Sequence, residues 1–280
     1  MSAWEKLAAL PREIVLTIVL IAMIVPAIRP FGLPIMVGKM SKDWYNTVDS
    51  LPEGSIVLFD IGFGSGGYPT LGPCAVAALH QMFEKHLKIV IMATALEGSM
   101  MYPLIMEKVK PEKNYGAEYG KDYVFLGYIA GEQTAMAAVL GDIHTAVKED
   151  YYGTPIEQIP LLQEITGPES FALVAYLTTS GGIAEGWVYQ AYSRYKLPVV
   201  GGFLSMMTPS LKPYYDAGAL KGILDGIKGA ADMEYMTHHP GDAMRATDIL
   251  SATQTIVLIF IVIGNISYWG SRLSKREGEK

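Results

Sequence analysis

The chain has a single cysteine, Cys74, in 280 residues, and it is short of basic residues. One cysteine excludes an internal disulfide and any cysteine-based zinc site within a single chain. Lysine and arginine number 22 against 28 aspartates and glutamates, which gives a net charge of −6. Because binding to nucleic-acid phosphates needs a basic face, this balance leaves no electrostatic case for a nucleic-acid partner.

Several catalytic signatures are also missing. No G-x-x-x-x-G-K-[ST] motif occurs, and neither Ser65 nor Ser180 lies in a G-x-S-x-G elbow, so nucleoside-triphosphate hydrolysis and acyl transfer lose their usual markers. His144 lies close to Asp142 in the sequence, and together they could bind a metal or transfer a proton. The simpler interpretation is that His144 is a hydrogen-bonded histidine in a loop. His238 and the histidine after it point to different sides, so they make a poor metal pair. We expect no metal site and assign no catalytic residue.

Long apolar runs are present at both ends of the chain. Half of the residues are hydrophobic and the mean hydropathy is +0.24. The runs Ile14–Ile28 and Ile249–Ser271 carry no charge, and the second is followed by a basic tail. Because spanning a bilayer takes about 20 residues, the first run needs some of its apolar flanks. The sequence predicts two transmembrane helices; a cleaved signal peptide is the alternative for the first.

Two spans would place both termini on the same side of a cell membrane. The short tails carry more basic residues than the flanks of the central region: Lys6, Arg12, Arg272, Lys275, Arg276 and Lys280. The positive-inside rule therefore predicts cytoplasmic tails and an extracytoplasmic domain.

The region between the runs alternates apolar strands with amphipathic helices. Because continuous apolar strands are typical of a sheet covered on both faces, we predict an α/β, Rossmann-like, three-layer domain with a mostly parallel sheet. The predicted division is 1–40 for the N-terminal tail and span, 41–240 for the domain, and 241–280 for the C-terminal span and tail. The predicted strands are Ile56–Phe59, Lys88–Ala93, Tyr123–Tyr128, Phe171–Leu177 and Leu197–Val200. The predicted helices are Leu71–Lys85, Ser99–Val109, Glu132–Val139, Ile183–Tyr195 and Ala217–Tyr235, with a long excursion from Gly141 to Pro168.

A glycine cluster follows the first strand. Gly62, Gly64 and Gly67 satisfy G-x-G-x-x-G, in which glycine lets the backbone approach a phosphate. We expect at least one of these glycines to need a positive φ. The alternative is a glycine-rich turn that only lets the chain cross the edge of the sheet.

With the preceding acid included, the same stretch resembles the first motif of S-adenosylmethionine-dependent methyltransferases, acid-x-Gly-x-Gly-x-Gly. Asp60, Gly62, Gly64 and Gly66 fit that pattern over about ten residues. The resemblance implies an adenine-nucleoside cofactor held by an acid at the tip of the second strand. The predicted second strand carries no such acid, since Glu97 lies beyond its tip. Tyr68, Pro69 and Pro73 are expected to delay the following helix.

A second glycine cluster follows the fourth predicted strand. Ser180, Gly181 and Gly182 precede a helix, and Gly201 and Gly202 were placed after the next strand. Because all these clusters fall at carboxyl ends of strands, they are candidates for one binding crevice. The cofactor-binding candidates are Asp60, Gly62, Gly64, Gly66, Gly67, Ser180, Gly181 and Gly182. The alternative for Ser180 is a helix cap.

Small residues recur every four positions in the last predicted helix, at Gly218, Gly222, Gly226 and Ala230. Such a row allows a close approach of another helix, so it predicts a contact in a homo-oligomer or, alternatively, against the domain's own sheet. Fifteen methionines and seventeen tyrosines also favour protein contacts. The preferred function is therefore a non-enzymatic, self-associating scaffold subunit in the membrane, without a cofactor. The alternative is an enzyme or sensor that binds a nucleotide or S-adenosylmethionine at Asp60–Gly67.

Overall fold

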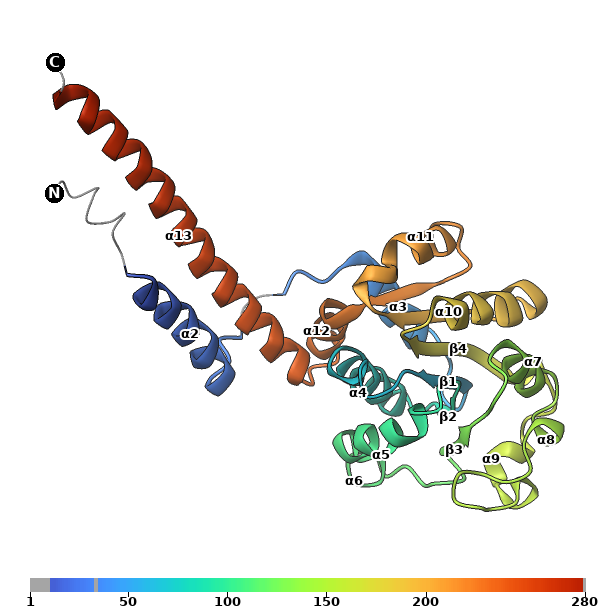
Figure 1. Ribbon diagram of the computed structural model, residues 1–280. Helices are drawn as coiled ribbons and strands as arrows, with labels where there is room; N and C mark the ends of the chain where they lie inside the picture. The colour runs from blue at the N-terminus through green and yellow to red at the C-terminus, as the bar shows by residue number, and fades with distance from the viewer. Residues whose placement is uncertain (1–10, 33–34, 279–280) are drawn as a thin grey trace. The chain divides into compact units, whose positions relative to one another are not determined.

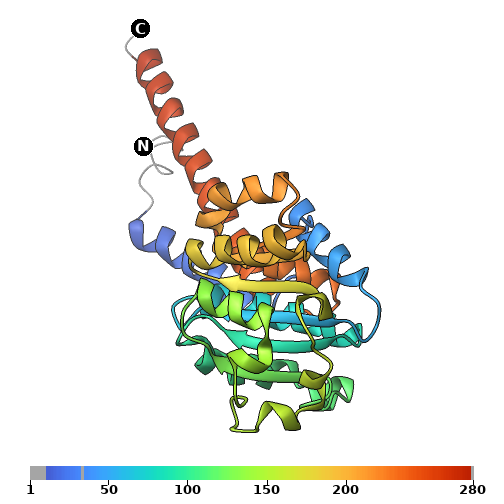
Figure 2. The ribbon, with the colours of Figure 1, turned by 90° about the vertical axis from the view of Figure 1, so that its right-hand side faces the viewer.

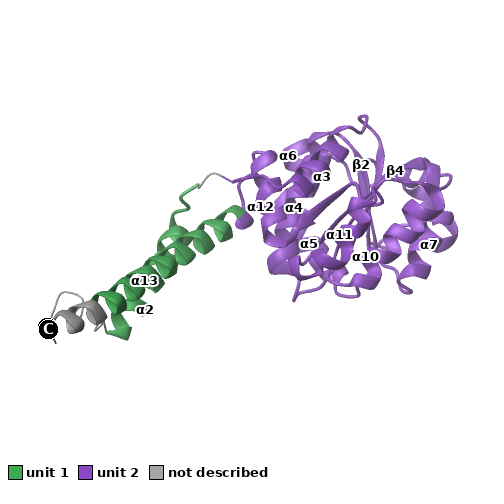
Figure 3. Cartoon of the chain, turned by 90° about the horizontal axis from the view of Figure 1, so that it is seen from above, with its two compact units in different colours: residues 1–34, 244–280 green, residues 35–243 purple. Residues whose placement is uncertain are grey.

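The structure, a computed structural model, describes residues 11–32 and 35–278. The chain divides into two compact units, shown in different colours in Figure 3. One unit consists of residues 1–34 and 244–280, and the other of residues 35–243. The larger unit is the α/β domain.

The α/β domain is built on a six-stranded sheet in which every strand pair is parallel (Figures 1 and 2). The strand order is β3-β2-β1-β4-β5-β6, which is the order of the doubly wound dinucleotide-binding fold. The strands are β1 (Ile56–Gly62), β2 (Lys88–Ala93), β3 (Tyr123–Tyr128), β4 (Phe171–Thr178), β5 (Val199–Phe203) and β6 (Gly222–Asp225). The predicted α/β class with a parallel sheet is confirmed.

Helices cover both faces of this sheet and complete the three layers. On one face lie α4 (Tyr68–Glu84), α5 (Gly98–Val109) and α12 (Gly226–Met236). On the other lie α7 (Gln133–Gly141), α10 (Gly181–Trp187) and α11 (Thr208–Asp216), whose apolar side chains share one buried cluster with alternate residues of the strands. Every residue of β1 is buried, which explains why its sequence, apart from Asp60, is apolar without alternation.

Both edge strands of the sheet are covered. Helix α3 (Lys39–Asp49) packs along β6. The excursion after α7 contains the short helices α8 (Ile143–Ala146) and α9 (Pro160–Gln163), and it bonds to β3 and the turn before it through Tyr151 N to Phe125 O and Leu161 N to Gly120 O, both 2.9 Å. Helix α6 (Pro111–Tyr115) lies between α5 and β3 in sequence. Covered edges leave no unpaired strand to template aggregation.

The long helix predicted for Ala217–Tyr235 is wrong. Gly218 lies in a turn at φ +77°, Gly222 begins β6, and α12 starts only at Gly226. A Cβ on Gly222 would overlap the backbone of Trp44 in α3, so this glycine serves the close packing of α3 on β6. The four small residues therefore form no row on one helix, and that basis for an oligomer contact is lost.

Two smaller expectations also fail. β5 extends to Phe203, so Gly201 and Gly202 lie inside the strand, where a Cβ would overlap the side chains of Tyr176 and Leu177 in β4. Helix α4 begins at Tyr68, directly after the glycine loop, because a proline fits the first turn of a helix without losing a needed N–H. Pro69 therefore does not delay the helix.

The smaller unit contains α2 (Arg12–Ile28) and all of α13 (Asp242–Gly278) except its first two residues, which belong to the larger unit. The segment after α2 is joined to α13 by a hydrogen bond that Gly32 N donates to Asp248 Oδ2, 2.9 Å long. Within the described residues one helix is long and apolar enough to cross a membrane, the segment Asp242–Gly270 of α13. α2 has 17 residues, fewer than the roughly 20 that a span needs, so the first predicted span is not shown by the described part of the chain.

Candidate ligand-binding crevice

The strand order reverses between β1 and β4. These strands are neighbours, but the chain moves from β1 towards β2 and from β4 towards β5. Helix α4, which follows β1, lies on one face of the sheet, and α10, which follows β4, lies on the other. In open parallel sheets, this divergence leaves a crevice outside the carboxyl ends of the two strands. Both sequence-predicted glycine clusters, 62–67 and 180–182, lie at these ends.

A hollow of about 500 Å³ lies at this edge of the sheet. Its volume is within the range of small-molecule sites. The loop after β1 contributes one wall, the segment after β2 a second, and the segments after β4 and β5 the rest. The lining residues are Gly64, Gly66, Gly67, Ala95, Leu96, Glu97, Thr179 and Leu204.

Glu97 is the charged residue of this hollow. Its Oε2 accepts hydrogen bonds from the amide and the hydroxyl of Ser65, both at 2.8 Å. The bond from the Ser65 amide, and then the one from its hydroxyl, hold the pKa of Glu97 below its ordinary value. No described residue bonds to Oε1. The carboxylate is therefore ionised at neutral pH, and its Oε1 can accept a hydrogen bond from a ligand.

Asp60 lies inside the domain rather than in the hollow. Its carboxylate accepts bonds from Thr94 N (2.9 Å), Thr94 Oγ1 (2.7 Å) and Trp187 Nε1 (2.7 Å). Burial raises its pKa from 3.8 to about 6, against the lowering effect of these bonds. Through these hydrogen bonds Asp60 connects β1 to the end of β2 and to α10. It therefore helps to fix the strand ends that border the crevice.

Close packing requires three of the loop glycines, Gly62, Gly64 and Gly67. None of them has a positive φ, so the prediction that at least one would need it is wrong. A Cβ on Gly62 would lie 3.0 Å from Oγ1 of Thr178 and of Thr94, and one on Gly67 would lie 2.7 Å from Cγ2 of Thr179. The glycine loop therefore packs directly against the end of β4 and the turn after β2.

The second predicted cluster lies beside the hollow. Thr178 Oγ1 donates to Gly62 O (2.9 Å) and accepts from Ser180 N (3.0 Å), so it joins the two loops. Ser180 occupies the N-cap position of α10, but its side chain makes no capping bond. Gly181 and Gly182 are exposed, and neither contributes to the lining.

Sequence reasoning missed Glu97 as a site residue. It was set aside because it lies beyond the tip of β2, but the turn 94–97 returns the chain to the glycine loop. A signal was present, since an acid directly before a helix that follows a strand is well placed to reach a neighbouring loop. Thr179 and Leu96 gave no comparable signal.

Asp142 and His144 have structural roles around the short helix α8. Asp142 caps α8 by accepting from His144 N (3.0 Å) and Thr145 N (3.3 Å), and His144 Nε2 contacts Ile165 O (3.1 Å), which agrees with a structural loop histidine. Within residues 11–32 and 35–278, no group of three acidic, histidine or cysteine side chains is arranged to hold a metal.

Comparison of the chain with protein-family models, with curated proteins and with solved structures gave no match. Its function must therefore be argued from its own geometry.

Proposed function

We propose that the α/β domain is a membrane-anchored nucleoside-binding domain, and that its crevice takes a ligand of the S-adenosylmethionine type rather than a dinucleotide. The observation that carries this proposal is the pair of hydrogen bonds that the Glu97 carboxylate accepts from Ser65. In a phosphate-binding glycine loop, the backbone amides face the phosphate. Here a carboxylate already accepts from the Ser65 amide.

A pyrophosphate in this loop would lie next to a negative charge. Two like unit charges 4 Å apart repel by about 1 kcal/mol in water and about 4 kcal/mol near a protein surface. S-adenosylmethionine has no phosphate, and it carries a sulfonium, an ammonium and ribose hydroxyls. Each of these can interact favourably with an ionised carboxylate, because Glu97 Oε1 has no other described partner.

The other walls suit the rest of such a ligand. Ala95, Leu96 and Leu204 are apolar and offer contact area to an adenine ring. Gly64 and Gly66 let the backbone approach closely. An acid that binds ribose beside a glycine loop is the arrangement of the doubly wound nucleotide-binding folds, whose strand order this sheet shares.

Equilibrium dialysis of the full chain in mild detergent, with radiolabelled S-adenosylmethionine and radiolabelled NAD⁺ in parallel, tests this function. We expect S-adenosylmethionine to bind about tenfold or more tightly than NAD⁺, in line with the repulsion estimated above. Tighter binding of NAD⁺, or no binding of either, contradicts the proposal.

A self-associating scaffold is the second candidate. Leu96, Met100 and Leu104 are 71%, 67% and 43% exposed and recur every four residues, so they form an apolar stripe that runs from the crevice along α5. Exposed apolar stripes mark contact surfaces. If this stripe joins copies of the chain, Met100→Glu reduces the particle size in detergent, whereas Met36→Glu at another exposed methionine does not.

We further propose that α13 and the apolar N-terminal run, which includes α2, both span the membrane. Their support is the length and composition of α13 and the uncharged stretch Ile14–Ile28. The basic residues Arg272, Lys275 and Arg276 in the C-terminal part of α13 favour a cytoplasmic location for both ends, which leaves the α/β domain on the outer side.

A further inference from the structure

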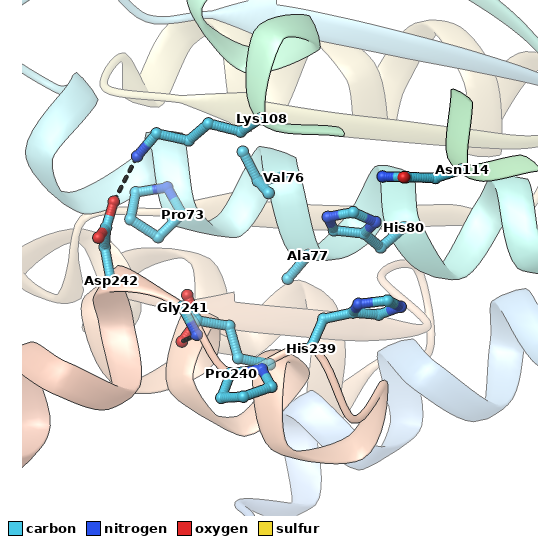
Figure 4. Close-up of a pocket in the computed structure, with 11 residues that line it drawn as sticks. Pro73, Val76, Ala77, His80, Lys108, Asn114, His239, Pro240, Gly241 and Asp242 are labelled. Carbon is cyan, nitrogen blue, oxygen red and sulfur yellow. Dashed lines mark hydrogen bonds and ion pairs between the residues drawn. The ribbon is translucent and has the colours of Figure 1, made fainter. Parts of the chain in front are cut away.

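A second pocket, of about 460 Å³, lies in the α/β domain away from the glycine loops (Figure 4). Its apolar wall is Pro73, Val76 and Ala77 of α4. Figure 4 shows His80 and Asn114 at one end of the pocket, and Lys108 with Asp242 at the other. His80 follows Pro73 by seven residues of helix, so the wall between the two ends is about 10 Å long.

The charged groups around this pocket are engaged with one another or with the backbone. Lys108 pairs with Asp242. Glu234 accepts from Gly241 N and Ala243 N, both at 3.0 Å.

His80 differs from these groups. It is only 7% exposed, and its ring stacks on His239, with centroids 4.3 Å apart. Its Nδ1 lies 2.5 Å from the Tyr115 hydroxyl, but no described residue bonds to its Nε2. The pKa of His80 is lowered from 6.5 to about 4, mainly by burial and secondly by the neighbouring His239. This imidazole is therefore neutral at physiological pH.

The surrounding hydrogen bonds determine where the His80 proton lies. His239 Nε2 lies 2.6 Å from a Glu84 oxygen and must carry a proton to donate to it. The Tyr115 hydroxyl then has His80 Nδ1 as its acceptor, which leaves the proton of His80 on Nε2. Asn114 donates through Nδ2 to Val109 O (2.7 Å) and keeps its Oδ1 as an acceptor.

We propose that this pocket is a second binding site, for a small uncharged molecule that presents a carbonyl or ring nitrogen to His80 Nε2 and an N–H to Asn114. An anion is disfavoured because the neutral His80 offers it no charge and Lys108 is already paired with Asp242. A cation is disfavoured at the buried end, where the Nε2–H donor of His80 would face it. A planar amide or heterocycle satisfies both polar groups and lies against the apolar wall of α4. This site needs nothing from the crevice.

Three probes of matched shape test the proposal on the full chain in detergent: benzamide, benzoate and benzylammonium. Binding is followed by the NMR signals of ¹⁵N-labelled histidines. We expect benzamide to shift the His80 signals, and each charged probe to bind about tenfold or more weakly. A charged probe that binds as well as benzamide, or benzamide that leaves His80 unshifted, overturns the proposal.

Two variants separate the hydrogen bond from packing. His80→Leu keeps the apolar bulk and loses the donor, so benzamide affinity falls about tenfold, the value of one hydrogen bond. His80→Gln places an amide N–H near the position of Nε2 and retains most of the affinity, which also shows that a loss in His80→Leu is not general unfolding. Unchanged binding to His80→Leu, or equal losses in both variants, overturns the assignment of Nε2 as the donor.

Discussion

The Glu97 carboxylate accepts hydrogen bonds from the amide and the hydroxyl of Ser65, both at 2.8 Å. In a phosphate-binding fold, the amides of this glycine loop would face an anion. Glu97 gives the crevice a negative charge, and the crevice lies where the strand order of the sheet reverses, between β1 and β4.

The pH dependence of ligand binding follows from this contact. Because the Ser65 bonds lower the pKa of Glu97, the carboxylate stays ionised down to pH values below the ordinary range for glutamate. Binding of S-adenosylmethionine should therefore be constant from pH 7 down to about pH 5 and weaken only in stronger acid. In Ser65→Ala the loss begins at higher pH. Isothermal titration across this range, with both proteins, checks it; an identical profile for the two would contradict the role of Ser65.

Gly64 and Gly66 offer a matched pair of substitutions. A Cβ on Gly64 would lie 2.8 Å from Glu97 Cβ, whereas one on Gly66 has nothing within 4 Å. We expect Gly64→Ala to displace Glu97, to weaken nucleoside binding about tenfold and to cost on the order of 1 kcal/mol of stability, because the exposed glutamate can move. Gly66→Ala should have little effect on either. Melting curves and dialysis of both variants decide, and equal effects would rule this packing role out.

Asp60 gives the domain a characteristic stability profile. Because its folded pKa is raised from 3.8 to about 6, its contribution is fully present below pH 3.8 and is lost as the pH rises through 6. A shift of this size corresponds to about 3 kcal/mol. Urea unfolding at several pH values should show that this decline is present in the native chain and absent from Asp60→Asn. The variant also loses an acceptor for Trp187 Nε1. If the difference between the two proteins does not change with pH, Asp60 is not titrating as described.

The membrane topology can be tested with single cysteines. The basic residues at the C-terminal end of α13 should be costly to translocate against the membrane potential. A cysteine at Lys148 in the domain should react with a membrane-impermeant reagent on intact cells, while one at Ser274 should not. The native Cys74 is buried and serves as the unreactive background. Labelling at Ser274 alone would reverse the proposed orientation.

Much of the sheet could be predicted because its strands are buried on both faces. β2 and β3 were placed with their observed bounds, since each is a short apolar run that ends at a turn. β1 was cut short at Phe59 because Asp60 reads as a loop residue, yet three donors in the interior satisfy it. In the sequence alone, an acid inside a strand looks like the end of that strand, because its buried hydrogen-bond donors cannot be seen.

Glycine was the main source of error. A spacing of four residues suggested a helical row, but Gly222 is needed because α3 approaches β6 closely, and Gly201 because the Tyr176 ring lies over it. These demands come from residues 25 to 178 positions away, so no local pattern contains them. The same holds for Glu97, whose partner Ser65 lies 32 residues earlier.

The most direct test of the nucleoside assignment is the effect of Glu97→Gln on the choice between S-adenosylmethionine and NAD⁺, measured by isothermal titration with the full chain. Removing the charge should weaken binding of S-adenosylmethionine about tenfold and strengthen binding of NAD⁺, while Glu107→Gln, in the helix α5 that Glu97 precedes, should change neither affinity. Glu97→Gln with both affinities unchanged, or a native chain that already prefers NAD⁺, would contradict the account.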